Sequence, residues 1–107
     1  MGVELPAPVR AFFDATNAED RAGFLAAFAE DGVVDDWGRE FQGHKAIGRW
    51  SDGENIGVHS RFEVTHASLQ NGAYVVTATV SGGGFNGPSH FTFRVRDGVI
   101  SRMTITE

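Results

Sequence analysis

The chain has 107 residues, enough for one hydrophobic core but not for a second independent one, so we expect a single domain over residues 1–107. Its formal net charge is −5, and its nine Lys and Arg residues are scattered singly, which excludes the basic stripe of a nucleic-acid-binding protein. Cysteine is absent, which excludes disulfides, thiolate catalysis and thiolate metal sites.

The N-terminal segment MGVELPAPVRAFF lacks the basic start and long apolar run of a signal peptide, and no stretch approaches the length of a membrane span. We therefore expect a cytoplasmic protein with no membrane partner. Two prolines suit a first helical turn, and apolar residues then recur at helical spacing, which predicts a first helix over Leu5–Ala18. Asp20 is predicted to cap a second helix that ends near Gly32. Phe12 and Phe28 lie on the apolar stripes of these helices and are candidate pocket residues.

A short strand, Val33–Trp37, carries two adjacent carboxylates. Strand side chains alternate between faces, so Asp35 and Asp36 must point to opposite sides and one of them faces inward. A buried carboxylate is costly unless it is paired, hydrogen-bonded or neutralised, which makes the inward Asp the best clue to chemistry. In the alternative interpretation this Asp caps backbone N–H groups or pairs with Arg39.

The segment after this strand is predicted to contain a second short strand and a third helix that covers one end of the fold. A short extended piece at Glu40 and Phe41 can pair with the preceding strand, and a short third helix is predicted over His44–Trp50. Residues 51–57 (SDGENIG) have turn chemistry and predict a loop. Trp50, at the end of this third helix, is a candidate pocket contact.

The four histidines do not predict a metal site, because none has the i, i+4 spacing on a helix or the i, i+2 spacing on a strand that shared ligands need. We expect no metal and no cofactor. His59 lies where the loop enters the next strand and is a candidate polar contact at the pocket mouth, although a surface position is the alternative.

The second half of the chain is predicted to be four strands joined by two hairpin turns at Asn71-Gly72 and Asp97-Gly98 and by a glycine-rich connection at residues 82–88. The strands are Val58–Leu69, Tyr74–Ser81, Ser89–Arg96 and Val99–Thr106. Alternation over the second and third of them places one set of side chains on the inner face as candidate pocket residues. This set comprises Val76, Ser89, Phe91 and Phe93.

The register of the last hairpin has two readings. A simple two-residue turn sets Arg102 opposite Phe93, so that Arg102 points inward and Met103 and Ile105 point outward. A one-residue bulge reverses these directions, and hydrophobicity favours the reversal. In the first reading, outward Val75, Met103 and Ile105 predict a homodimer through the outer sheet face.

Helices followed by strands indicate an α+β domain. The pattern resembles the nuclear transport factor 2-like superfamily, and more closely its small SnoaL-like and ketosteroid isomerase-like members. The resemblance rests on TNAEDRAGFLAAFAEDGVVDDWG, on FQGHKAI and on HFTFRVRDGVISRM, and it covers nearly the whole chain. It implies a cone-shaped, curved antiparallel sheet with three N-terminal helices packed on its concave face.

The resemblance also implies roles for single residues. Asp36 matches the general base of the ketosteroid isomerases, whose oxyanion hole is a tyrosine and a protonated aspartic acid. Phe12 and Ser89 stand in those two places, so classical steroid isomerisation is not expected. An inward Arg102 beside Asp36 would resemble the limonene epoxide hydrolase branch, for which Glu63 is the nearest second carboxylate by strand parity.

These observations predict a small-molecule-handling protein with an apolar pocket, in which Asp36 is the candidate general acid or base and Arg102 its candidate partner. The expected ligand is a small apolar molecule. The alternative is a non-catalytic binding or dimerisation module of the same fold, in which Phe side chains fill the cavity.

Overall fold

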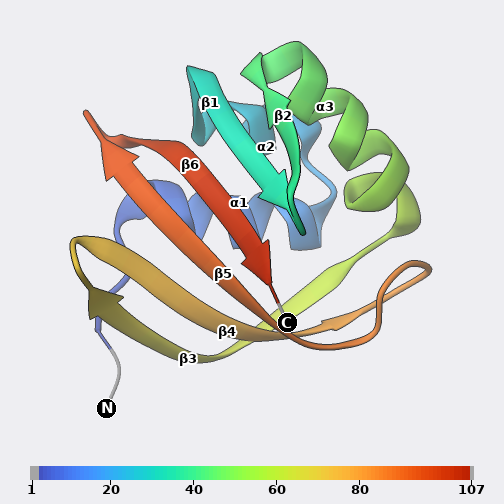
Figure 1. Ribbon diagram of the computed structural model, residues 1–107. Helices are drawn as coiled ribbons and strands as arrows, with labels where there is room; N and C mark the ends of the chain where they lie inside the picture. Colours follow the sequence, from blue (N-terminus) through green and yellow to red (C-terminus); the bar gives the residue numbers. More distant parts are fainter. Residues whose placement is uncertain (1–2, 107) are drawn as a thin grey trace.

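The computed structural model describes residues 3–106, which form a curved, six-stranded mixed sheet with three helices on one of its faces (Figure 1). The strand order is β2-β1-β6-β5-β4-β3. The strands are β1 (Phe28–Asp36), β2 (Arg39–Gln42), β3 (Arg61–Gln70), β4 (Ala73–Ser81), β5 (Gly87–Arg96) and β6 (Val99–Thr106). The helices are α1 (Ala7–Ala18), α2 (Arg21–Ala26) and α3 (Gly43–Glu54), with a single 3₁₀ turn, η1 (Ile56–Val58). The α+β class is confirmed.

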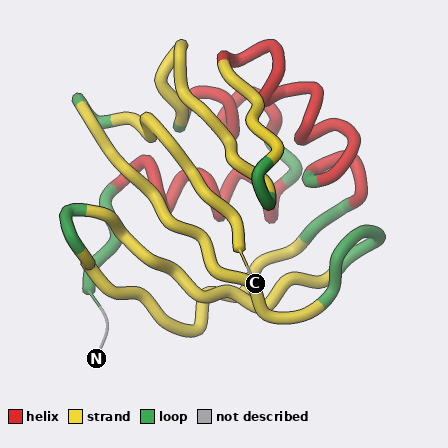
Figure 2. The backbone as a smooth tube through the Cα atoms, in the orientation of Figure 1, coloured by secondary structure: helices red, strands yellow, loops and turns green. Residues whose placement is uncertain are grey.

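The sheet is mixed, whereas the expected sheet was antiparallel. Strand β1 pairs in parallel with β6, and every other neighbouring pair is antiparallel. Figure 2 shows the consequence, with the first strand of the chain lying beside the last one. The parallel pair therefore joins the two halves of the sequence in one sheet.

The core lies between the helices and the sheet and is dominated by phenylalanine. Phe12 of α1 is fully buried, and its ring centroid lies 4.9–6.2 Å from those of six other Phe rings. Three of these contacts, with Phe13, Phe28 and Phe93, are edge to face, a geometry that adds to the free energy of burial. Phe12 is thus the centre of the core.

The second helix is shorter than predicted. Asp20 caps it as expected, because its Oδ1 accepts a hydrogen bond from the Gly23 N–H at 3.0 Å. The helix ends at Ala26, however, and Phe28 and Gly32 belong to β1. The parallel pairing of Phe28 with Ile100 overrides the local helical pattern. A Cβ atom on Gly32 would lie 3.0 Å from the Ala29 carbonyl oxygen, so this irregular start of β1 leaves little room for a side chain there.

The third helix is longer than predicted, because it includes residues 51–54 of the predicted loop. Ser51 is fully buried, and its carbonyl oxygen accepts a hydrogen bond from the Asn55 N–H at 3.0 Å. Burial of this turn outweighs the weak helix propensity of Gly53. The third helix therefore has 12 residues and runs over Gly43–Glu54.

The last hairpin contains a bulge, which was one of the two registers compatible with the sequence. Asp97 and Gly98 adopt the left-handed region with φ of 56° and 79°, as a two-residue turn requires. The register then shifts between Arg94 and Val95, so that Arg102 pairs with Arg94 and Met103 with Phe93. Met103 is consequently buried in the core and Arg102 lies on the outer face.

This register corrects the predicted outer set of apolar residues. Met103 is 0% exposed and Ile105 is 7% exposed, both on the inner face, and only Val75 of the three points outward.

No helix within residues 3–106 is long and apolar enough to cross a membrane.

Candidate functional site

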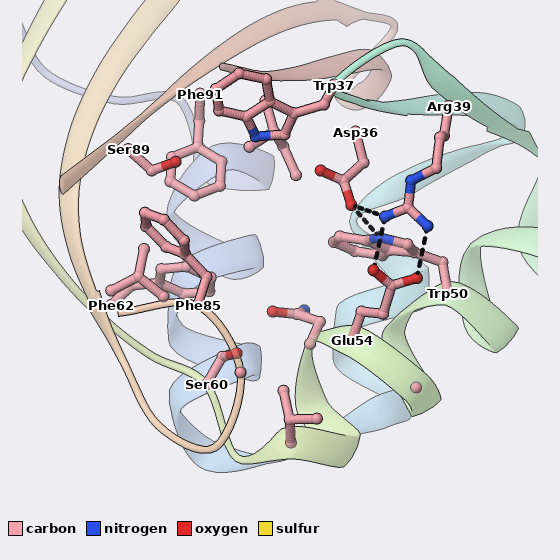
Figure 3. A pocket seen from close by; sticks show the side chains of 16 residues that line it. Asp36, Trp37, Arg39, Trp50, Glu54, Ser60, Phe62, Phe85, Ser89 and Phe91 are labelled. Carbon is pink, nitrogen blue, oxygen red and sulfur yellow. Dashed lines mark hydrogen bonds and ion pairs between the residues drawn. The ribbon is translucent and has the colours of Figure 1, made fainter. Parts of the chain in front are cut away.

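A pocket of about 360 Å³ opens at one end of the core (Figure 3). The ends of β1 and α3 form one wall, and residues of β3, β4 and β5 form the opposite wall. The lining residues are Asp36, Trp37, Arg39, Trp50, Gly53, Glu54, Asn55, Val58, Ser60, Phe62, Val80, Gly84, Phe85, Ser89, Phe91 and Ile105.

Asp36 is the last residue of β1 and faces this pocket. Its Oδ2 atom accepts hydrogen bonds from Trp50 Nε1 at 3.0 Å and from Arg39 Nη2 at 2.6 Å. Its side chain is only 15% exposed. No residue in the described range donates a hydrogen bond to the other oxygen, Oδ1, and Oδ1 is not sealed from solvent. Asp36 is thus oriented through one oxygen and open to the pocket through the other.

Arg39 links Asp36 to a second carboxylate. Its Nη1 and Nη2 atoms donate to Glu54 Oε2 at 3.0 Å and Oε1 at 2.6 Å, in the two-pronged geometry that favours such pairs. The hydrogen bonds from Arg39 are the main cause that lowers the pKa of Glu54, and the Coulombic attraction adds to them. Hydrogen bonds to Glu54 and then to Asp36 raise the pKa of Arg39.

The opposite wall is aromatic. Phe62 and Phe91 pack edge to face with ring centroids 5.3 Å apart, and Figure 3 shows both on the side facing Asp36. Two aromatic residues remain about half exposed at the pocket, Trp37 at 58% and Phe85 at 52%. Trp37 and Gly38 form the two-residue turn between β1 and β2, and Trp37 has the positive φ, 55°, that such a turn requires.

The predicted pocket residues divide into two groups. Trp50, Ser89 and Phe91 line the pocket together with Asp36. The others do not line it, since four of them are core residues that are at most 2% exposed and one is a surface residue. The core residues are Phe12, Phe28, Val76 and Phe93. His59 is the surface residue, with its Nδ1 atom 3.1 Å from the Glu19 carboxylate.

Arg102 does not reach Asp36. It lies on the outer face, where its Nη2 atom donates to Asp35 Oδ2 and to Glu40 Oε2, both at 2.8 Å. Glu63 is also on the outer face, paired with Thr79. The bulge in β6 explains why the prediction of an inward Arg102 was wrong, because it reverses the direction of this side chain.

Arg39 and Glu54 provide the guanidinium and the second carboxylate that were sought at Arg102 and Glu63. Pairing of Asp36 with Arg39 was the alternative to a catalytic role for this carboxylate, and the structure shows that contact. Glu54 was missed because its segment resembled a loop. The signal for Glu54 is its position four residues after Trp50, which places both on one helical face once α3 continues.

Comparison with known proteins agrees with this fold. Residues 9–103 match the family model of the SnoaL-like domain, and no curated protein matches the sequence. Among solved structures, the chain is similar to a proposed polyketide cyclase from Sinorhizobium meliloti, with 31% identity, a TM-score of 0.83 and 95% of each chain covered.

Two further structures are similar at the level of the fold. A proposed ketosteroid isomerase from Kribbella flavida has 22% identity and a TM-score of 0.79, over 92% of this chain and 73% of that one. The protein RV0760c from Mycobacterium tuberculosis, in complex with estradiol-17beta-hemisuccinate, has 23% identity and a TM-score of 0.74, over 94% and 90%. The predicted resemblance to ketosteroid isomerase-like proteins is confirmed at the level of the fold, and the chain belongs to the SnoaL-like domain family.

Proposed function

We propose that the protein binds a small, mainly apolar molecule in this pocket and that Asp36 acts on it as a general acid or base. The observation that carries the proposal is the position of Asp36, which has one oxygen held by Trp50 and Arg39 and the other open to an aromatic wall. A proton-transfer group must reach the ligand in a fixed orientation, and this arrangement meets both needs.

Ser60 is the candidate donor to a ligand oxygen. Ser89 is less suited to this role, because its Oγ donates to the Thr106 carbonyl oxygen at 3.2 Å. Ser60 lines the pocket, and its hydroxyl has no hydrogen-bond partner among residues 3–106. A single hydroxyl is a weaker oxyanion stabiliser than the two donors of a ketosteroid isomerase, so we expect a substrate that develops less charge.

The named relatives support the ligand class. One is named as a polyketide cyclase and another was solved with an estradiol derivative, both of which point to cyclic, mainly apolar molecules. The volume of about 360 Å³ falls within the usual range of small-molecule pockets.

Phenylacetone tests the proposal, because it is an apolar ketone with acidic C–H bonds. Binding is followed by the indole N–H resonance of Trp50, and catalysis by deuterium incorporation into the ketone in heavy water. Asp36→Asn should preserve binding and slow the exchange by about a hundredfold or more. Asp35→Asn, on the opposite face of β1, is the matched control and should exchange at the normal rate. Equal rates for the wild type and Asp36→Asn would reject the catalytic role.

The second candidate function is a non-catalytic binding module. Two residues favour it. The Ser89 hydroxyl already donates its proton to a backbone carbonyl, and the Phe12 side chain is apolar, so neither can stabilise an oxyanion. In that case phenylacetone binds to the wild type, but exchange does not exceed the rate in buffer.

A homodimer through the outer face of the sheet is part of the proposal. Ser68, Val75, Thr92 and Thr104 lie in register across β3, β4, β5 and β6 and form an uncharged stripe on that face. A stripe of small and β-branched side chains suits packing of one sheet against another. The cytoplasmic location stays a prediction.

A further inference from the structure

We propose that the pocket selects an organic cation, namely a protonated amine carried on an apolar body. This inference rests on the proposed function, because it names the class of ligand that the pocket binds. It follows from the charges of the pocket, from the direction of its hydrogen-bonding groups and from its aromatic residues.

The charged residues of the pocket favour a cation. Two carboxylates, Asp36 and Glu54, face one guanidinium, that of Arg39, so the charged lining has a net charge of −1. Both terminal nitrogens of Arg39 already donate to these carboxylates. An anionic ligand that approached Arg39 would therefore lie against two like charges, which costs affinity.

Asn55 adds a hydrogen-bond acceptor from the buried side of the pocket. It is 2% exposed, and its Nδ2 atom lies 3.4 Å from both Thr16 Oγ1 and Ser51 Oγ. Thr16 donates its own proton to the Phe12 carbonyl oxygen at 2.8 Å, so it can only accept from Asn55. This fixes the amide with Nδ2 toward the hydroxyls and Oδ1 away from them.

The Oδ1 atom of Asn55 has no hydrogen-bond donor among residues 3–106. No buried side-chain oxygen of those residues lacks both a partner and contact with solvent, so this oxygen is not sealed off, and Asn55 is one of the residues that line the pocket. Together with Asp36 Oδ1 it presents a second unpaired acceptor. A protonated amine has several N–H donors and can donate to such acceptors, which an anion cannot.

The aromatic residues complete the site. Five of the sixteen lining residues are Trp or Phe, and Trp37 and Phe85 remain half exposed. The faces of such rings attract cations, and their area also covers the apolar body of the ligand. Charge, acceptors and aromatic faces thus favour the same ligand class.

Four probes with one aromatic ring separate these contributions: benzylamine, benzyltrimethylammonium, benzyl alcohol and benzoate. At neutral pH and low salt, benzylamine should bind about tenfold more tightly than benzyl alcohol, and benzoate should bind most weakly. Benzyltrimethylammonium has the charge without N–H donors, so its affinity should lie between those of benzylamine and benzyl alcohol. Affinities are measured by titration of the Trp50 indole resonance and by calorimetry.

Glu54→Gln should weaken the binding of benzylamine about fivefold and strengthen the binding of benzoate, since the substitution removes one negative charge from the pocket. Asp52→Asn is the matched control, because Asp52 lies on the same helix but pairs with exposed Arg21 outside the pocket, and it should leave all four affinities unchanged. Equal or tighter binding of benzyl alcohol or benzoate than of benzylamine overturns the inference.

The outcome for the proposed function is read separately. If phenylacetone binds while benzylamine shows no preference or does not bind, only the choice of a cation is overturned. If neither phenylacetone nor any of the four probes binds, the proposed pocket function is overturned with it.

Discussion

The Asp36 carboxylate is held by groups from two different elements, the indole of Trp50 on α3 and the guanidinium of Arg39 on β2. The Trp50 bond is the more specific of the two, because the ring is itself positioned by stacking on Phe24 at a centroid distance of 6.4 Å. Arg39 is half exposed and its bond to Asp36 is more open to screening by solvent. Trp50 is therefore the residue that sets the direction of Asp36.

Trp50→Phe should destabilise the fold by about 1–2 kcal/mol, because it removes a hydrogen bond to a charged group while an aromatic ring remains against Phe24. Trp37→Phe should change stability by no more than about 0.5 kcal/mol, since Trp37 is exposed and makes no side-chain hydrogen bond within residues 3–106. Urea unfolding measures both. Equal effects of the two substitutions would contradict the positioning role of Trp50.

Glu54 gives the site a predicted pH dependence. Its pKa in the folded protein is lowered below 4.5 by Arg39, so the ion pair stabilises the fold above the unfolded pKa. This contribution is lost as the pH falls through the lowered folded value. Glu54→Gln should therefore be less stable than the wild type at neutral pH, and the difference should vanish once the pH has fallen below the lowered pKa of Glu54 in the folded protein.

Urea unfolding over this pH range checks the prediction for Glu54, and a double-mutant cycle identifies the cause. In an Arg39→Gln background, Glu54→Gln should no longer show the pH-dependent difference, because the partner that lowers the pKa is gone. A difference that stays constant from neutral to acid pH would show that Glu54 contributes by packing alone.

At the scale of elements, the pocket depends on how α3 ends and η1 begins. The chain turns back on itself so closely that a Cβ atom on Gly57 would overlap the backbone carbonyl of Asp52. By contrast, a Cβ atom on Gly53 within α3 would meet nothing within 4 Å. The same substitution at these two glycines thus probes the junction and the helix separately.

Gly57→Ala should destabilise the protein by about 3 kcal/mol or more, because backbone atoms must move apart at the junction. Gly53→Ala should stabilise it by about 0.5–1 kcal/mol through its better helix propensity. Thermal and urea unfolding measure both changes. If Gly57→Ala is tolerated as well as Gly53→Ala, the close turn does not hold α3 against the pocket.

At the scale of the whole molecule, the helices cover one face of the sheet and leave the other bare (Figure 1). The uncharged stripe of Ser68, Val75, Thr92 and Thr104 crosses this bare face. Charged pairs lie beside it, such as Arg102 with Asp35 and Glu40. The stripe is therefore the part of the face best suited to contact a second copy.

Sedimentation at micromolar concentration should show a dimer, and Thr92→Lys in the middle of the stripe should convert it to a monomer. Thr79→Lys, outside the stripe on the same face of β4, is the matched control and should leave the dimer intact. A wild-type monomer would mean that the Thr-rich face is exposed to water, as one face of an antiparallel sheet can be.

The sequence predicted elements with strong local signals and failed where distant contacts decide. The turns at Asn71-Gly72 and Asp97-Gly98 were found because each needs residues that tolerate positive φ. The end of α2 was wrong because pairing of Phe28 with β6 determines it. Alternation placed Asp36 opposite Asp35. The apolar character of Met103 and Ile105 favoured the bulge that turns Arg102 outward, but the turn residues alone were equally compatible with a simple hairpin.

The candidate site was predicted in part for the same reason. Asp36, Trp50, Ser89 and Phe91 were recognised from alternation, helical spacing and the family resemblance. Glu54 was hidden by a glycine-containing segment that becomes helical only when Ser51 is buried. Burial depends on the assembled fold, which a local pattern does not contain.

The charged wall of the pocket has a further consequence. All its charged residues, and the tryptophan that orients Asp36, come from the continuous stretch 36–54, whereas the Phe wall comes from later strands. The charged groups and the Phe wall are therefore encoded by separate blocks of sequence, with Asn55 and Ser60 between them. Replacement of that one short block, in evolution or by design, would give the same apolar wall a new charged partner without altering β3 and β5, which carry Phe62 and Phe91.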